Sequence, residues 1–162
     1  MNEAVNVKFA KVRPGAKIPS KRDEDMGFDI YACFDEEYMI IHPHETKLIP
    51  TGIASSCNSD YGFVLRERGS TGSKGIALRA GVIDSGYRNE WFVGLTNTTN
   101  KDVVIHKHDI VADDAIIYPY SKAIAQALIL PVPKVEVEEI SYDELKTIES
   151  KRGLGALGSS GK

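Results

Sequence analysis

An acid followed by a tight turn and an aromatic ring stands near the middle of the chain, in residues 78–90. The apolar residues 80–83 lead directly into Asp84, and a Ser-Gly turn and Tyr87 follow. A strand edge here would supply backbone donors and acceptors, the carboxylate could act as a general base, and the ring could form one wall of a pocket. The alternative is a β-hairpin whose turn carries an acid and whose tyrosine packs on it.

A second stretch, residues 66–75, follows an expected strand and is rich in glycine, hydroxyl groups and cations. Successive N–H groups in such a turn form a nest for an anion, and Arg68 can bind two phosphate oxygens at once. The pattern GxxxxGK[ST] of a P-loop is absent. A flexible basic loop is the alternative interpretation.

The C-terminal residues 151–162 have a similar composition, with Arg152, several glycines, Ser159 and Ser160. A mobile arm with these donors could close over a phosphate chain and exclude water, whereas the alternative is a disordered tail. Two stretches suited to phosphate and one turn bearing an acid together favour a nucleoside triphosphate as the ligand.

Other candidate sites are less well supported. The pairs His42/His44 and His106/His108 each place two imidazoles on one strand face, but no cysteine or third histidine is in register for zinc. The run from Lys21 to Asp25 is most simply a solvated loop.

Composition restricts the class of protein. A chain of 162 residues is long enough for one domain, and 42% hydrophobic with 27% charged residues is typical of a soluble globular protein. The net charge is −3 and there is no lysine-arginine stripe, so duplex nucleic acid is not an expected partner. The longest apolar run, 123–132, is too short to span a bilayer, and we expect no signal peptide, because the first residues lack a basic region followed by an apolar one. Cys33 and Cys57 lack CxxC pairing, which indicates reduced thiols and a cytoplasmic location.

Short alternating segments separated by turn residues predict about ten strands and one helix. The helix begins at the capping box formed by Ser141 and Glu144, with Leu145 and Ile148 on its apolar side. This pattern predicts an all-β sandwich, barrel or jelly roll over residues 1–150 and a flexible arm over 151–162. The expected strands cover residues 5–9, 26–32, 38–41, 46–53, 61–66, 90–96, 103–106, 115–118, 124–130 and 135–137.

Five stretches, taken in order, resemble the five motifs of the homotrimeric dUTPases, a family that includes phage-type members. They span nearly the whole chain, and the third and fifth are the most specific. The five stretches are residues 26–32, Arg68-Gly69-Ser70, 81–87, 124–127 and 152–161.

The resemblance implies a jelly-roll fold, a homotrimer with sites between subunits, and Mg²⁺-dependent hydrolysis of dUTP to dUMP and pyrophosphate, which limits uracil in DNA. It implies that Asp84 activates the water that attacks the α-phosphorus. Backbone groups at Gly81, Val82 and Ile83 would bind the uracil edge, and Tyr87 would pack on the deoxyribose.

The resemblance also assigns the phosphate contacts. The magnesium ion would be held by the triphosphate and water, so no direct protein ligand is expected. Asp29 would lie near Arg68 and near the water molecules bound to the magnesium ion. The phosphate-binding residues would be Arg68, Gly69, Ser70 and Gln126, with Arg152, Ser159 and Ser160 from the tail of another subunit.

This sequence departs from the family pattern at several positions. Gly69 replaces a usual serine, Asn89 replaces a usual glycine, and Leu157 replaces the phenylalanine that stacks on uracil. The stretch 109–120 is an insertion or a rewritten connection. A second alignment of the fourth motif, on residues 108–113, would place Asp113 rather than glutamine beside phosphate, where like charges repel.

Two alternative functions are compatible with the same fold. A dCTP deaminase would need a glutamate on the strand after the third motif, and residues 91–97 contain no acid. A nucleotide-sensing regulatory module would bind an unknown protein partner, for which residues 109–122 are the candidate surface.

Overall fold

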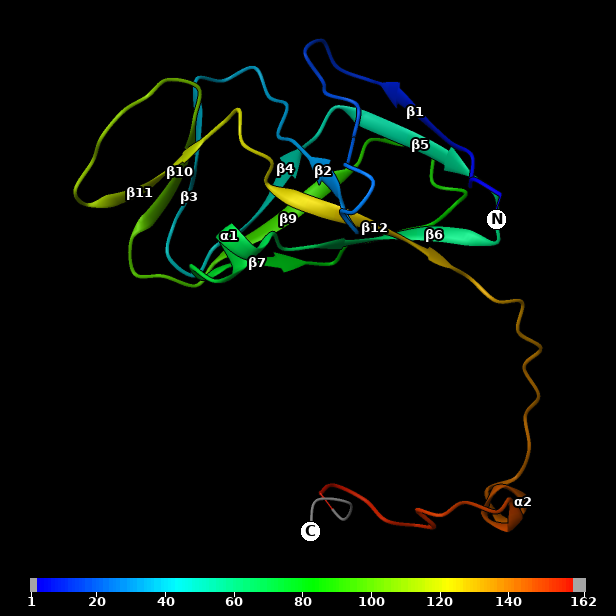
Figure 1. The fold of residues 1–162 in the computed structure, drawn as a ribbon. Helices are drawn as coiled ribbons and strands as arrows, with labels where there is room; N and C mark the ends of the chain where they lie inside the picture. The colour runs from blue at the N-terminus through cyan, green and yellow to red at the C-terminus, as the bar shows by residue number, and fades with distance from the viewer. Residues whose placement is uncertain (1–2, 159–162) are drawn as a thin grey trace. The chain divides into compact units, whose positions relative to one another are not determined.

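The computed structural model describes residues 3–158, and the chain divides into two compact units (Figure 1). The first unit ends at Val132 and the second begins at Pro133. The separation of a mobile arm at residue 151 stays a prediction. Among the described residues, no helix is both long and apolar enough to cross a membrane.

The first unit is built almost entirely of β-strands, because its sequence alternates apolar and polar residues between turns. A single helical turn, α1 (Gly69–Gly72), interrupts the strands, and α2 (Tyr142–Thr147) belongs to the second unit. The strands are β1 (Val7–Lys11), β2 (Phe28–Ile30), β3 (Tyr38–Ile41), β4 (Thr46–Pro50), β5 (Ile53–Cys57), β6 (Tyr61–Arg66), β7 (Ile76–Arg79), β8 (Val82–Ile83), β9 (Phe92–Asn97), β10 (Asp102–His106), β11 (Ala115–Pro119) and β12 (Ala125–Pro131).

The strands form small sheets around one shared core. The strand orders are β1-β5, β11-β10-β3, β2-β12-β6-β8 and β4-β9-β7, and all strand pairs except β10 with β11 are antiparallel. The prediction of an all-β jelly-roll fold is confirmed. The sheet that contains β12 and β6 matters most for function, because four of the predicted site residues lie on it and Asp84 directly follows it.

Aromatic rings fill the centre of the first unit. The ring of Trp91 is fully buried and lies 5.1 Å from the ring of Phe63 and 5.6 Å from that of Phe9, measured between centroids. Its indole N–H donates to the Ser55 hydroxyl at 3.1 Å. Because a buried indole needs a partner for its N–H, Ser55 allows the tryptophan to be placed in the core.

Two expectations about strands were wrong, and one strand was missed. The segment 46–53 forms two strands, because Gly52 adopts a φ of +69° and turns the chain between β4 and β5. Strand β7 was not anticipated. The alternating Val135 and Val137 form no strand, and their side chains are exposed, because the segment pairs with no other strand among the described residues.

The predicted start of α2 is confirmed. Ser141 has an extended backbone, and its hydroxyl accepts a hydrogen bond from the Glu144 N–H at 3.1 Å. Leu145 and Ile148 are more than half exposed, so the helix buries no residue.

The side chain of Asn97, at the end of β9, holds the turn between β9 and β10 in place through hydrogen bonds. It is fully buried, and its amide donates to the Ile41 carbonyl at 2.9 Å and to the Lys101 carbonyl at 2.7 Å. Its side-chain oxygen accepts from the backbone N–H and the hydroxyl of Thr99.

We expect Asn97→Ala to lower the free energy of unfolding by about 2–4 kcal/mol, since it removes the buried donor to the Ile41 carbonyl and one of the two side-chain donors to the Lys101 carbonyl. Urea unfolding followed by the fluorescence of Trp91 measures this change. The exposed Asn100 in the same turn gives the matched control, Asn100→Ala, which should change stability little. Equal losses in the two variants would contradict the role given to Asn97.

Candidate functional site

Three strands bring the first group of predicted site residues together. Gln126 of β12 lies opposite Asp29 of β2 on one side and opposite Arg66 of β6 on the other. Arg68 follows two residues after Arg66, where β6 has ended and α1 is about to begin. This register favours residues 124–127 as the fourth motif. The second alignment would put Asp113 in the place of Gln126, but Asp113 lies in the connection between β10 and β11.

The guanidinium group of Arg68 is fixed from two sides. Its Nε lies 3.5 Å from Asp29 Oδ1, and one of its terminal nitrogens donates to the Ala123 carbonyl at 3.1 Å. The hydroxyl of Tyr118 donates to the same carbonyl at 2.5 Å, and burial raises the pKa of this tyrosine. Arg68 is therefore held in place before any ligand binds, and only part of its donor capacity is used.

The amide of Gln126 is also fixed. Its nitrogen donates to the Glu67 carbonyl at 2.8 Å. A Cβ at Gly27 would lie 2.4 Å from the amide oxygen of Gln126 and 3.0 Å from its Cβ, so a larger residue at this position would displace the Gln126 side chain. The Glu67 carboxylate accepts from the Leu78 N–H at 3.0 Å, and this bond holds the pKa of Glu67 below its usual value.

The first two residues of α1, Gly69 and Ser70, include a buried polar side chain without a partner among the described residues. The hydroxyl oxygen of Ser70 is buried and has no hydrogen-bond partner among the described residues. An unsatisfied buried hydroxyl is costly, so this group is suited to a ligand that supplies an acceptor or donor. The space around Gly69 is open enough for the serine usual in the family.

These residues line one cavity of about 740 Å³. Of the predicted site, Asp29, Arg68, Gly69, Ser70 and Gln126 meet there. The remaining wall is formed mainly by the loop before β2. The lining residues are Ser20, Lys21, Arg22, Glu24, Asp25, Met26, Gly27, Asp29, Arg68, Gly69, Ser70 and Gln126.

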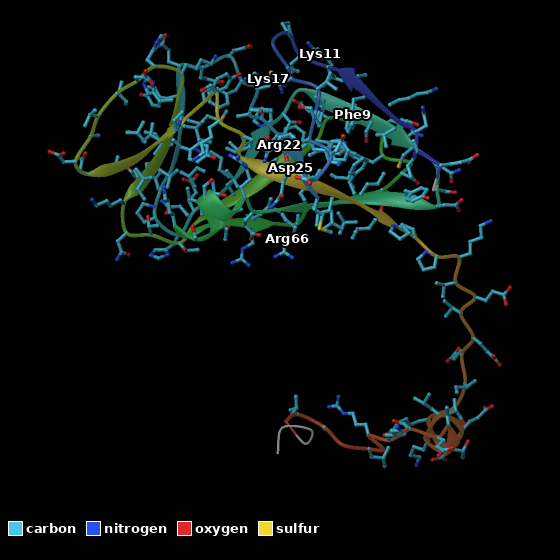
Figure 2. The ribbon with its side chains drawn as sticks, in the orientation of Figure 1. Phe9, Lys11, Lys17, Arg22, Asp25 and Arg66 are labelled. Carbon is cyan, nitrogen blue, oxygen red and sulfur yellow. The ribbon has the colours of Figure 1, made fainter. Side chains whose placement is uncertain are left out.

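Sequence reasoning missed the contribution of the loop at residues 20–25. The Asp29 N–H donates to the Ser20 carbonyl at 2.9 Å, which places the loop beside β2. Arg22 and Asp25 lie side by side and form two hydrogen bonds of 2.9 and 3.0 Å, which lower the pKa of Asp25 (Figure 2). The charge run could not reveal this, because both a solvated loop and a cavity wall are rich in charge.

Lys21 is the cation of this wall without a carboxylate partner among the described residues. Its ammonium group donates to the carbonyls of Arg22 and Asp23, at 3.2 and 3.5 Å, and lies 5.7 Å from the centroid of the Phe28 ring. An anion in the cavity would therefore find a cation there in addition to Arg68.

The stretch at residues 78–90 faces a different cavity. Val82, Ile83 and Asp84 help to line a space of about 270 Å³ beside the first half of β6. Gly81 has a φ of +110°, and a Cβ there would lie 3.0 Å from the Leu65 carbonyl, so glycine is required for β8 to approach β6. Asp84 is exposed, and its carbonyl accepts from the Tyr87 N–H at 3.1 Å in the predicted turn.

One chain therefore presents the two halves of the predicted site separately. Ile83 pairs with Phe63 near the start of β6, whereas Arg66 ends that strand. Three residues of strand correspond to roughly 10 Å. Within the described part of the chain, the acid and the cavity that contains Arg68 lie at opposite ends of β6.

The second unit carries the described part of the fifth motif. The Arg152 side chain donates to the Gly155 carbonyl at 2.8 Å, and Leu157 is fully exposed. Ser159 and Ser160 lie outside the described residues. In residues 3–158, no group of three or more histidine, cysteine, aspartate or glutamate side chains is arranged to hold a metal ion.

The fold and cavity define the chain as a jelly-roll protein with a fixed arginine, a free hydroxyl and an amide suited to a phosphorylated ligand. The sequence model of the dUTPase family matches residues 13–161. The chain belongs to the dUTPase family.

Two relatives agree with this assignment, and a solved structure has the same fold. A deoxyuridine 5'-triphosphate nucleotidohydrolase of Nautilia profundicola is 35% identical, with 98% of this chain and all of that protein covered. One from Neisseria meningitidis serogroup C is 34% identical, with 99% of each covered. The Staphylococcus bacteriophage 80alpha dUTPase with dUPNHPP has a TM-score of 0.77 at 22% identity, with 97% of this chain and 99% of that chain covered.

Proposed function

We propose that this protein hydrolyses dUTP to dUMP and pyrophosphate. The observation that carries the proposal is the convergence of Arg68, Ser70 and Gln126 in one cavity, within a chain of the dUTPase family. The orphaned Ser70 hydroxyl supports a ligand with hydrogen-bonding oxygens at this place. The two free cysteines are compatible with a reducing, cytoplasmic location.

The phosphate chain would bind in the cavity. Arg68 would donate two hydrogen bonds to phosphate oxygens, since its contact with Asp29 leaves terminal donors available. The backbone at Gly69 and the Ser70 hydroxyl would contact the same chain. Gln126 would contact its outer end through the amide hydrogen that Glu67 does not take.

The nucleoside would bind at the stretch 81–87 in the manner the family implies. The backbone at Gly81, Val82 and Ile83 would read the uracil edge, and Tyr87 would pack on the sugar. Asp84 would orient a water molecule and take its proton as the water oxygen attacks the α-phosphorus, and pyrophosphate would leave.

Magnesium fits this arrangement without a dedicated protein cage. When bound, Mg²⁺ would neutralise charge on the triphosphate, and it commonly keeps several water ligands. The half-exposed carboxylate of Asp29 faces the cavity and could accept hydrogen bonds from such water molecules.

A homotrimer would complete the site. Asp84 and the Arg68 cavity lie apart along β6 in one chain. This separation supports a site between two subunits, in which one subunit supplies Asp84 and the other supplies the Arg68 cavity. Arg152, Ser159 and Ser160 would come from the C-terminal arm of another subunit and clamp the outer phosphates. Sedimentation should then give a trimer, and a monomer would contradict this assembly.

The direct test is pyrophosphate release with Mg²⁺ from dUTP, compared with dCTP, dTTP and UTP. We expect faster release from dUTP than from dCTP, because a backbone edge that matches uracil leaves polar groups unpaired against cytosine, and faster release than from UTP, because Tyr87 packed on the sugar leaves no room for the 2′-hydroxyl. The absence of release from dUTP would overturn the proposed activity.

The place of Lys21 in the cavity wall predicts a contribution to the binding of dUTP. We expect Lys21→Gln to raise the KM for dUTP about three- to tenfold with little change in kcat, because an exposed cation contributes modest binding to a phosphate chain. Steady-state kinetics at low and high salt measure this, and screening should shrink the effect at high salt.

Lys17→Gln is the matched control, because Lys17 is an exposed lysine of the same segment whose ammonium lies over the Tyr31 ring and does not line the cavity. Identical KM values for the Lys17 and Lys21 variants would remove Lys21 from the site.

A further inference from the structure

The ring of Tyr87 is anchored by a hydrogen bond to the main chain of a neighbouring residue. Its hydroxyl donates to the Glu90 carbonyl oxygen at 2.9 Å, and its backbone N–H donates to the Asp84 carbonyl at 3.1 Å. A phenol ring held at both ends has little freedom to tilt. The position of the ring therefore depends on the position of the Glu90 carbonyl.

The Glu90 side chain is pinned by partners far away in the sequence. One carboxylate oxygen lies 2.6 Å from Arg13 Nε and accepts the Gly52 N–H at 2.9 Å. Glu90 is only 8% exposed, whereas the Arg13 side chain is 40% exposed. A buried carboxylate with two donors cannot move without losing both bonds, so Glu90 is tied to the segments before β2 and β5.

The backbone on either side of Glu90 is fixed too. The Glu90 N–H donates to the side-chain oxygen of Asn89 at 2.8 Å, and this asparagine stands where the family usually has glycine. The next residue, Trp91, is fully buried, and its carbonyl accepts from the Thr51 hydroxyl at 2.6 Å. The Glu90 carbonyl is thus a rigid acceptor between two anchored residues.

We propose that Glu90, held by Arg13, is a positioning residue that fixes Tyr87 and thereby sets the discrimination of the enzyme between deoxyribose and ribose. This inference rests on the proposed function, in which Tyr87 packs on the sugar. Glu90 touches neither substrate nor water in this scheme and acts only through the tyrosine.

Exclusion of a hydroxyl depends on rigidity more than on contact area. A pocket wall that can retreat by a fraction of an ångström accommodates the 2′-hydroxyl of UTP, whereas a wall that cannot retreat rejects it. Loosening Tyr87 should therefore help UTP relative to dUTP, while the chemistry at Asp84 continues. A loss of stability alone would affect both substrates alike.

The experiment measures kcat/KM for dUTP and UTP in variants of the full chain. We expect Glu90→Ala to lower the dUTP-to-UTP ratio about five- to tenfold, the scale of one hydrogen bond. Glu90→Gln should keep most of the ratio, because the amide oxygen can still accept from Arg13 and Gly52. Tyr87→Phe should lower the ratio by a similar factor.

The double variant separates a shared effect from two independent ones. If Glu90 acts through the tyrosine hydroxyl, Tyr87→Phe combined with Glu90→Ala should lower the ratio no further than either change alone. Multiplied effects in the double variant would overturn the inference. Arg13→Gln removes the exposed partner of the ion pair and should lower the ratio two- to threefold, on the order of a weakened hydrogen bond, even if Glu90→Ala fails to fold.

Glu45→Ala is the matched control, since the Glu45 carboxylate also accepts a backbone N–H, from His42 at 2.7 Å, but lies in the turn before β4. It should reduce stability without changing the ratio. A wild-type ratio in Glu90→Ala and Arg13→Gln, or an equal fall in Glu45→Ala, would overturn the role of Glu90 while leaving dUTP hydrolysis established. A wild-type chain inactive on dUTP would instead overturn the proposed function and this inference together.

Discussion

Asp84→Asn is expected to lower kcat for dUTP by about a thousandfold, within the range that a general base contributes. The amide has nearly the same shape as the carboxylate but cannot take a proton from water. Binding should survive, because the proposed contacts to base, sugar and phosphate come from other residues. Single-turnover pyrophosphate release gives the chemical step, and calorimetry with a non-hydrolysable dUTP analogue gives the dissociation constant.

The control for this variant is a second exposed acid in a turn. Asp60→Asn changes the turn between β5 and β6, where Asp60 contributes its backbone to the pairing with Val132. We expect this variant to hydrolyse dUTP at the wild-type rate. If Asp84→Asn turned over as fast as Asp60→Asn, another group would have to be the base.

Local sequence patterns predicted most strands because their causes are local. Burial alternates along β6 and β10 because each strand has one buried face, and the capping box of α2 needs only two residues that are three apart. Alternation failed at Val135 and Val137 because a strand also requires a partner edge, which no local pattern encodes. The turn at Gly52 was missed because the residues that leave no room for a side chain there, Ala16 and Cys33, are far away in the chain.

Local sequence patterns also fail to predict parts of the candidate site that depend on contacts between distant residues. The resemblance predicted Arg68, Ser70 and Gln126, and the strand register places them around one cavity. Composition could not indicate that Lys21 joins this wall, since its place follows from the pairing of Ser20 with Asp29. Glu90 gave no signal either, because its partner Arg13 is 77 residues away.

Removal of residues 152–162 should lower kcat/KM for dUTP by at least about a hundredfold, because the proposed arm supplies charge neutralisation and excludes water during the reaction. The folded unit should remain, since every buried residue of the core lies in residues 16–127. Thermal unfolding and sedimentation of the truncated chain test this, and both should match the full-length protein.

Separate measurements of binding and of the chemical step test whether the arm acts as a phosphate clamp. Without Arg152, Ser159 and Ser160, dUMP should bind as before, because it lacks the outer phosphates, whereas the dUTP analogue should bind more weakly. A chain that lacks only Lys162 is the matched control and should behave as wild type. If the longer deletion weakened dUMP and dUTP equally, the lost contacts would be to the nucleoside, and the arm would not act as a phosphate clamp. Since Leu157 replaces the stacking aromatic of the family, we expect the phosphate contacts to provide most of the closure in this protein.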